Sequence, residues 1–135
     1  MKKTFLLAIL FLLLSACSNS SADITGEWKL ISYGDVNNPT PALPNVDTSI
    51  KFDSNGQIGG SVGCNTFGGN YEKSYSTITF SGIFSTMMYC DETSTQEQAV
   101  LGTFSDSVSL QTQLNGSTLT ITSADGSSVV VLERK

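Results

Sequence analysis

The side chains that could do chemistry in this chain are three cysteines and a scatter of carboxylates, with no histidine among them. The 135 residues include seven Lys and Arg, twelve Asp and Glu and no His. Histidine is the usual general base and the commonest metal ligand, so its absence argues against a Ser-His-Asp triad and most zinc sites. No other base lies near a Ser, Thr or Cys nucleophile. We therefore expect a protein that is not an enzyme and that holds no metal or cofactor.

A pair of carboxylates of the kind that cleaves glycosides is the catalytic arrangement that the composition still permits. A hydrolase of this kind would place two carboxyl groups about 5–10 Å apart in a pocket. Twelve acids are also what a soluble acidic surface needs, so this hypothesis is the least favoured. The candidate residues are Asp53, Asp91, Glu92, Glu97 and Asp106.

The glycine-dense segment 59–71 (GGSVGCNTFGGNY) is the most distinctive part of the sequence. Backbone N–H groups of such a loop can cradle phosphate, but neither a Gly-Lys-Ser/Thr sequence nor a predicted helix follows it. Glycine also fits bulges and tight turns, which explains the segment without a nucleotide. The segment Asp53–Gly56 lacks the closing Glu of a calcium loop and is predicted to be a hairpin turn.

The N-terminus has the features of an export signal. Lys2 and Lys3 precede ten apolar residues (5–14), which are too few to span a bilayer as a helix. The following Leu-Ser-Ala-Cys resembles a bacterial lipobox, which implies that Cys17 is lipidated and becomes the first mature residue. An ordinary secretory signal with a chance cysteine is the alternative. We predict a lipoprotein signal peptide over 1–16, a lipidated flexible tether over 17–23 and one domain over 24–135.

This interpretation places the protein in the cell envelope. Ser18, rather than Asp, follows the cysteine, which in Gram-negative lipoproteins usually implies the outer membrane; we expect the periplasmic face and fatty acyl chains such as palmitate on Cys17. Without Lys2 and Lys3, the mature chain has five basic and twelve acidic residues. Nucleic acid is therefore not an expected partner, and we expect a monomer held to the membrane by its lipid.

Two cysteines, Cys64 and Cys90, remain after Cys17. In an oxidising compartment an even pair is most simply a disulfide. A copper(I) site with the thioethers of Met87 and Met88 is one alternative, and two free thiols are the other. The residue pattern alone leaves these three open.

Alternating apolar residues and Gly- or Asn-containing turns predict an α+β fold that is mostly antiparallel sheet. A helix is predicted after Ser94, with Ser94 and Glu97 as a capping box and Val100, Leu101 and Phe104 on one face. The loop 34–47 contains all three prolines and is predicted to be mobile. About eight short strands are expected, at 26–33, 49–52, 57–62, from 71, 77–80, 107–112, 118–122 and 128–133, with 85–90 extended. Most aromatic residues are expected in the core: Trp28, Tyr33, Phe52, Phe67, Tyr71, Phe80, Phe84, Tyr89 and Phe104.

Two motifs resemble those of the META domain family, in particular its HslJ-type heat-shock lipoproteins. The family motif residues are Gly63, Cys64, Asn65, Phe67, Gly69, Tyr71, Thr86, Met88 and Cys90. The resemblance covers about residues 24–135 and implies an antiparallel, partly open barrel with one helix and a Cys64–Cys90 disulfide. It implies no catalytic residue, and it associates the chain with envelope stress. Tyr89 departs from the family pattern, in which a small Ala is common at this position.

Three functions from different classes follow. The first is a non-enzymatic module that contacts another envelope protein through the Pro-rich loop or the Gly-rich rim. The second is a carrier of a small apolar ligand or lipid in a half-open barrel, and the third is the hydrolase. The expected contact residues are Asn37, Asn38, Pro39, Pro41 and Leu43 in the loop and Asn65, Phe67 and Asn70 in the rim; a carrier cavity would be lined by Phe52, Ile58, Phe80 and Leu119.

Overall fold

The structure is a computed structural model that describes residues 21–105 and 107–135. The predicted signal peptide, the predicted lipidation site Cys17 and the carboxylate Asp106 lie outside the described residues. Within the described part, no helix is both long enough and apolar enough to cross a membrane. The elements, in chain order, are β1 (Gly26–Asp35), β2 (Thr40–Pro41), β3 (Ser49–Phe52), β4 (Gln57–Ser61), β5 (Thr66–Ser74), β6 (Thr77–Ser85), α1 (Ser94–Thr103), β7 (Ser109–Asn115), β8 (Thr118–Thr122) and β9 (Ser128–Arg134).

The strands form an antiparallel barrel that closes on itself. The order β1-β3-β4-β5-β6-β7-β8-β9 is completed by pairing between β1 and β9, and β2 adds a short strand beside β1. The predicted α+β, barrel-like fold is thus confirmed. The family resemblance implied a partly open barrel, whereas the ring of paired strands is continuous. Two of its strand pairs, β1–β3 and β6–β7, are joined by only three residue pairs each.

Local sequence explains the hairpins that connect neighbouring strands. In the β3–β4 turn the Asp53 carboxylate accepts the backbone N–H groups of Asn55 and Gln57, and Gly56 takes a positive φ of 81°. The β7–β8 turn follows Asn115, the last residue of β7, and its Gly116 also takes a positive φ, of 59°. Such turns favour antiparallel neighbours because they bring consecutive strands back beside each other.

Large apolar side chains fill the barrel. Trp28, Phe52 and Phe80 are fully buried, and Phe104 at the end of the helix packs its ring 4.6 Å from that of Phe80. The four residues predicted to line a carrier cavity, Phe52, Ile58, Phe80 and Leu119, are at most 3% exposed and belong to this one core cluster. They therefore serve as packing for the barrel.

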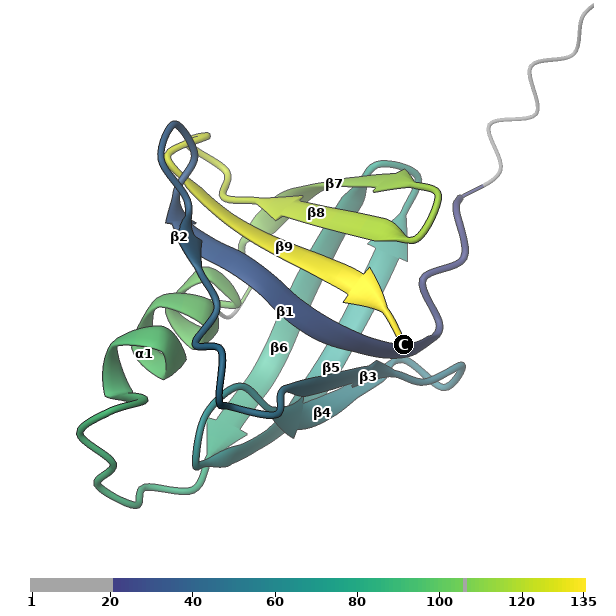
Figure 1. Cartoon of the computed structure of the whole chain (residues 1–135). Helices are drawn as coiled ribbons and strands as arrows, with labels where there is room; N and C mark the ends of the chain where they lie inside the picture. The colour runs from purple at the N-terminus through teal and green to yellow at the C-terminus, as the bar shows by residue number, and fades with distance from the viewer. Residues whose placement is uncertain (1–20, 106) are drawn as a thin grey trace, which may run out of the picture.

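The two ends of the barrel are covered by different segments, as Figure 1 shows. Helix α1 lies at one end, and the N-terminal tail reaches the other. There Ile24 is 2% exposed and its carbonyl accepts the Trp28 indole N–H, while Arg134 donates to the Thr25 carbonyl and stacks on Trp28 at 4.3 Å. The first described residues, 21–25, thus lie at the end opposite the helix.

Several element boundaries differ from the prediction. β1 runs on to Asp35, β5 starts at Thr66 instead of Tyr71, and β6 continues to Ser85. β5 and β6 are longer because their glycines are accommodated within the strands, with a register shift between Gly68 and Asn70.

The Pro-rich loop, predicted to be mobile, is fastened at its centre. The Ala42 N–H donates to the Ile31 carbonyl, and the Leu43 N–H donates to Oε1 of Gln96. Gln96 is fully buried and also donates from Nε2 to the Val62 carbonyl. This helix residue therefore holds two loops against the end of the barrel.

The predicted capping box is wrong. The N-cap of α1 is Thr93, one residue earlier than Ser94, and its side chain makes no capping hydrogen bond. Ser94 donates instead to the Asp91 carbonyl, and Glu97 is directed away from the helix terminus toward Asn65. Glu97 thus binds Asn65, which is distant in the sequence, in place of the backbone at its own helix terminus.

Gly60 provides a test of the β3–β4 pairing. Its φ is +147°, and a Cβ atom would lie 1.8 Å from the Ser49 carbonyl oxygen. We expect Gly60→Ala to lower the free energy of unfolding by roughly 3 kcal/mol, measured by chemical denaturation. Gly102→Ala is the matched control, because nothing lies within 4 Å of its Cβ position; it should raise stability by up to about 1 kcal/mol. Equal stability of the two variants would contradict the assigned register.

Candidate functional site

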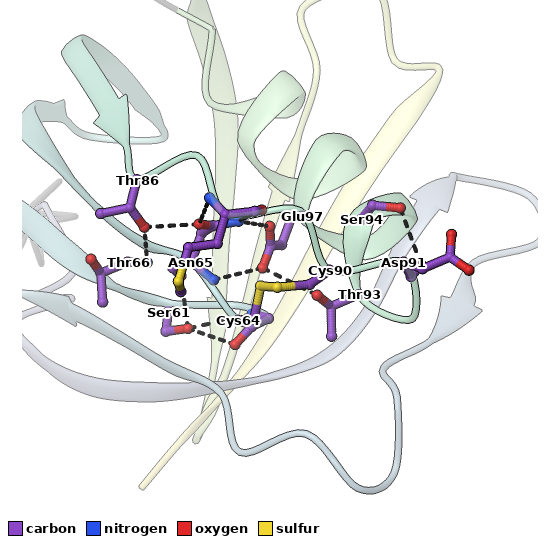
Figure 2. Close-up of a disulfide and its surroundings, with 12 residues drawn as sticks. Ser61, Cys64, Asn65, Thr66, Thr86, Cys90, Asp91, Thr93, Ser94 and Glu97 are labelled. Atoms are coloured by element: carbon purple, nitrogen blue, oxygen red, sulfur yellow. Dashed lines mark hydrogen bonds between the residues drawn. A yellow bond between two sulfur atoms is a disulfide. The ribbon is translucent and has the colours of Figure 1, made fainter.

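The sequence motifs meet where the helix joins the end of the barrel (Figure 2). Residues 62–65 connect β4 to β5, residues 86–93 connect β6 to α1, and Glu97 lies in the first turn of the helix. The Cys64–Cys90 disulfide links the two loops with a Cα–Cα distance of 6.4 Å, which is within the normal range. The predicted disulfide is confirmed. We call Gly63, Cys64, Asn65, Thr86, Met88, Cys90 and Glu97 the motif cluster.

The side-chain amide of Asn65 is at the centre of this cluster. Its Nδ2 donates to the Met88 carbonyl at 3.0 Å and to Oε2 of Glu97 at 2.8 Å. Its Oδ1 accepts the Met88 N–H at 2.8 Å and the Thr86 hydroxyl at 2.9 Å. The amide has two donors and two acceptor sites, so its hydrogen-bonding capacity is filled. It pairs with both backbone groups of Met88, as the next residue of a strand would.

Glu97 is a buried carboxylate held by hydrogen bonds. It is 8% exposed, and its Oε1 accepts the Asn65 backbone N–H at 2.8 Å. Burial alone would raise the pKa of Glu97, but hydrogen bonds from Asn65, from the Cys64 backbone and from the Thr93 hydroxyl outweigh burial and leave the pKa below its usual value. The carboxylate is therefore ionised at neutral pH and stabilises the donors around it.

Gly63 is required by the close approach of Glu97. A Cβ atom at this position would lie 2.2 Å from Oε1 of Glu97. Thr86 completes the connection to the barrel, because its hydroxyl accepts the Thr66 N–H at 3.1 Å while its own N–H donates to the Thr66 carbonyl. The motif residues of the two loops are thus held together by hydrogen bonds to the Glu97 carboxylate and to β5.

The other motif residues lie outside the cluster. Phe67 is buried with its ring 6.3 Å from that of Phe104. Gly69 lies at the β5 register shift, where a Cβ would be 2.6 Å from Ile83. Tyr71 packs edge-on to Phe52 and donates to the Asp53 carbonyl at the opposite end of the barrel. These three positions are explained by packing.

Several predicted contact residues have other roles. Asn65 and Phe67, expected on an exposed rim, are buried at 7% and 5% exposure, whereas Asn70 is exposed. In the Pro-rich loop Asn37, Asn38, Pro39 and Pro41 are exposed and Leu43 is half-buried.

The predicted carboxylates are not brought together. Asp53 lies in a turn at the end of the barrel opposite Glu97, and Asp91 and Glu92 precede the helix as exposed residues. Among residues 21–105 and 107–135, no three His, Cys, Asp or Glu side chains are grouped as a metal site would require.

Sequence reasoning missed a set of exposed apolar side chains beside the motif cluster. Phe84 and Tyr89, both expected in the core, are 68% and 87% exposed. Met87 and Met88 are 95% and 60% exposed. We call residues 84–89, the last two residues of β6 and the four that follow, the apolar loop. A hollow of about 310 Å³ separates this loop from the start of α1, and its lining includes Met88, Tyr89, Glu97 and Gln98.

The fold and the motif cluster define a class of small closed antiparallel barrels in which a disulfide and a buried Asn–Glu pair attach one helix to the barrel end. The META domain family model matches residues 22–135, so the chain belongs to the META domain family. No curated protein matches the chain.

Solved structures share the fold at low sequence identity. A protein from Burkholderia xenovorans, solved by NMR, is 17% identical with a TM-score of 0.66 over 82% of this chain and 81% of that one. A second NMR structure is 21% identical, with a TM-score of 0.59 over 78% and 86% of the two chains. A DUF4847 family protein from Bacteroides vulgatus ATCC 8482 is 14% identical, with a TM-score of 0.58 over 82% and 93%.

Asn65→Asp tests the role of the central amide. The variant removes both donors and places a second carboxylate against Glu97, so we expect a loss of about 3 kcal/mol or more in unfolding free energy. Asn70→Asp is the matched control on the exposed face of β5 and should change stability by no more than about 0.5 kcal/mol. Similar small effects of both changes in urea denaturation would contradict the assigned network.

The lowered pKa of Glu97 predicts a pH dependence of stability. Its stabilising contribution is present above the ordinary Glu value of 4.5 and is lost as the pH falls through the lower value of the folded protein. Wild type should therefore exceed Glu97→Gln in unfolding free energy at pH 7, and the difference should shrink below pH 4.5. Denaturant titrations of both proteins at each pH measure it; a difference that is constant or grows on acidification would contradict this assignment.

Proposed function

We propose that this META-domain protein is a lipid-anchored module of the bacterial envelope that acts by binding another envelope protein through the apolar loop, without catalysis. The observation that carries the proposal is the exposure of Phe84, Met87, Met88 and Tyr89 within six residues. Contiguous exposed apolar side chains on a small domain are typical of interaction sites, and aromatic residues and Met are enriched in such sites.

The loop is also preorganised for binding. Its backbone is attached to Asn65 at Met88, to β5 at Thr86 and to Cys64 through Cys90. Binding of a partner would therefore cost little conformational entropy, because the loop backbone is already ordered. This rigidity supports a docking surface in preference to a loop that only folds back on its own core.

The position of the N-terminal tail supports anchoring at the other end. Ser21 accepts a hydrogen bond from Lys73, and Asp23 accepts one from Arg134, so part of the predicted 17–23 tether contacts the barrel. Ser21 is four positions after Cys17, a reach of about 14 Å. A lipid on Cys17 would hold this end near the membrane. β5, roughly 25 Å long, would then place the apolar loop away from it.

Two experiments in the producing bacterium test this function. Labelled palmitate should be incorporated into the wild type and not into Cys17→Ser, which should leave the membrane fraction. A photocrosslinking residue in place of Met87 should give a discrete protein adduct. The same residue in place of Tyr75, which is 64% exposed at the opposite end, should not. Equal adducts at both positions, or none at position 87, would overturn the proposed surface; turnover of a substrate that a single nondisruptive change abolishes would overturn the non-enzymatic role.

A further inference from the structure

The basic side chains of the barrel lie toward one of its two ends, where acidic residues accompany them. Lys73 contacts Ser21, Arg134 contacts Thr25, and Lys135 pairs with Glu27. Lys51 lies opposite Glu27 in the β1–β3 ladder, and Lys29 pairs with Glu133. All five basic residues of the described chain are thus on the strands and tail at the N-terminal end or on the adjoining half of β1.

The surroundings of the apolar loop carry only negative charge. No Lys or Arg occurs in residues 52–72 or 74–133, whereas Asp91 and Glu92 directly follow the loop and are exposed. Glu97 lines the hollow beside the loop. A partner that covers Met87 and Tyr89 therefore meets carboxylates at the edge of the contact.

Tyr89 joins the apolar and acidic parts of this surface. Its hydroxyl donates to Oδ1 of Asp91 at 3.1 Å, while the side chain remains 87% exposed. An aromatic ring beside a carboxylate suits a Lys or Arg side chain, which can lie over the ring face and pair with the carboxylate. The exposed Met87 beside it suits an apolar side chain.

We infer that the apolar loop and the acidic residues beside it, Asp91 and Glu92, bind a cationic, partly apolar segment of a partner protein. Its Lys or Arg side chains face Asp91, Glu92 and the Tyr89 ring, and its apolar side chains pack on Phe84 and Met87. This inference rests on the proposed function and names the class of its partner. A second copy docked through the same surface would bring like charges together, and an anionic bilayer would be repelled by the same carboxylates.

Defined peptides test the inference on the lipidated protein held in phosphatidylcholine nanodiscs. A fluorescent peptide of alternating Lys and Leu or Phe should bind saturably, and added salt should weaken binding. Peptides with Glu in place of Lys, or Ser in place of the apolar residues, should bind at least about tenfold more weakly. Absence of binding by the first peptide, or equal binding of the Glu peptide, would overturn the inference.

Matched variants locate the site, because any cation is attracted to an acidic protein. Asp91→Asn with Glu92→Gln should weaken binding about fivefold, as expected for two exposed charges. Asp47→Asn with Glu72→Gln makes the same change in net charge outside the loop and should leave the dissociation constant within about twofold. Met87→Ala with Tyr89→Ala should weaken binding about tenfold, and Tyr75→Ala should not. Equal effects of the two charge pairs would overturn the assigned surface.

The membrane alternative has its own outcome. A photocrosslinking residue in place of Met87 should form no lipid adduct in the nanodisc; a lipid adduct would overturn the inference in favour of membrane contact. A protein adduct at position 87 in cells, without a preference for the cationic peptide, would overturn the partner class alone. Loss of that adduct would overturn the proposed function as well.

Discussion

The side-chain amide of Asn65 is the interaction on which the helix end of this protein depends. Pairing of β5 with β6 ends at Phe67 and Ser85, and the Thr66–Thr86 hydrogen bond follows. Asn65 then continues the pairing with its side chain, bonding both backbone groups of Met88 and the carboxylate of Glu97. One buried amide thus joins two loops and the helix. The disulfide holds the same loops covalently.

This arrangement separates the structural and the exposed parts of one short segment. Thr86, Met88 and Cys90 attach the backbone inward, so the side chains of Phe84, Met87 and Tyr89 face solvent without loosening the chain. A segment with so many exposed apolar groups would otherwise tend to collapse onto the core or to associate nonspecifically. The fixed backbone keeps these side chains exposed, and the neighbouring acidic residues favour a cationic partner in the proposed interaction.

Sequence alone predicted the features that are determined by residues close together in the chain. The alternation of apolar residues located the strands, and Asp53–Gly56 and Asn115–Gly116 located two hairpins. The Cys64–Cys90 pairing followed from compartment and family resemblance. The Asn65–Glu97 contact could not be predicted, because its partners are 32 residues apart and Glu97 fits a local helix cap equally well. Phe84 and Tyr89 were placed in the core because side-chain type does not report that the backbone is fixed by sheet pairing at Phe84 and by Asn65 at Met88.

The most direct test of this account is the amide hydrogen exchange of residues 84–90 in the intact protein, measured by NMR. The Met88 N–H is bonded to buried Asn65, so it should exchange at least about a hundredfold more slowly than the N–H groups of Met87 and Tyr89. That pattern would show a fixed backbone carrying exposed side chains. Fast exchange of all three amides would contradict the central role of Asn65.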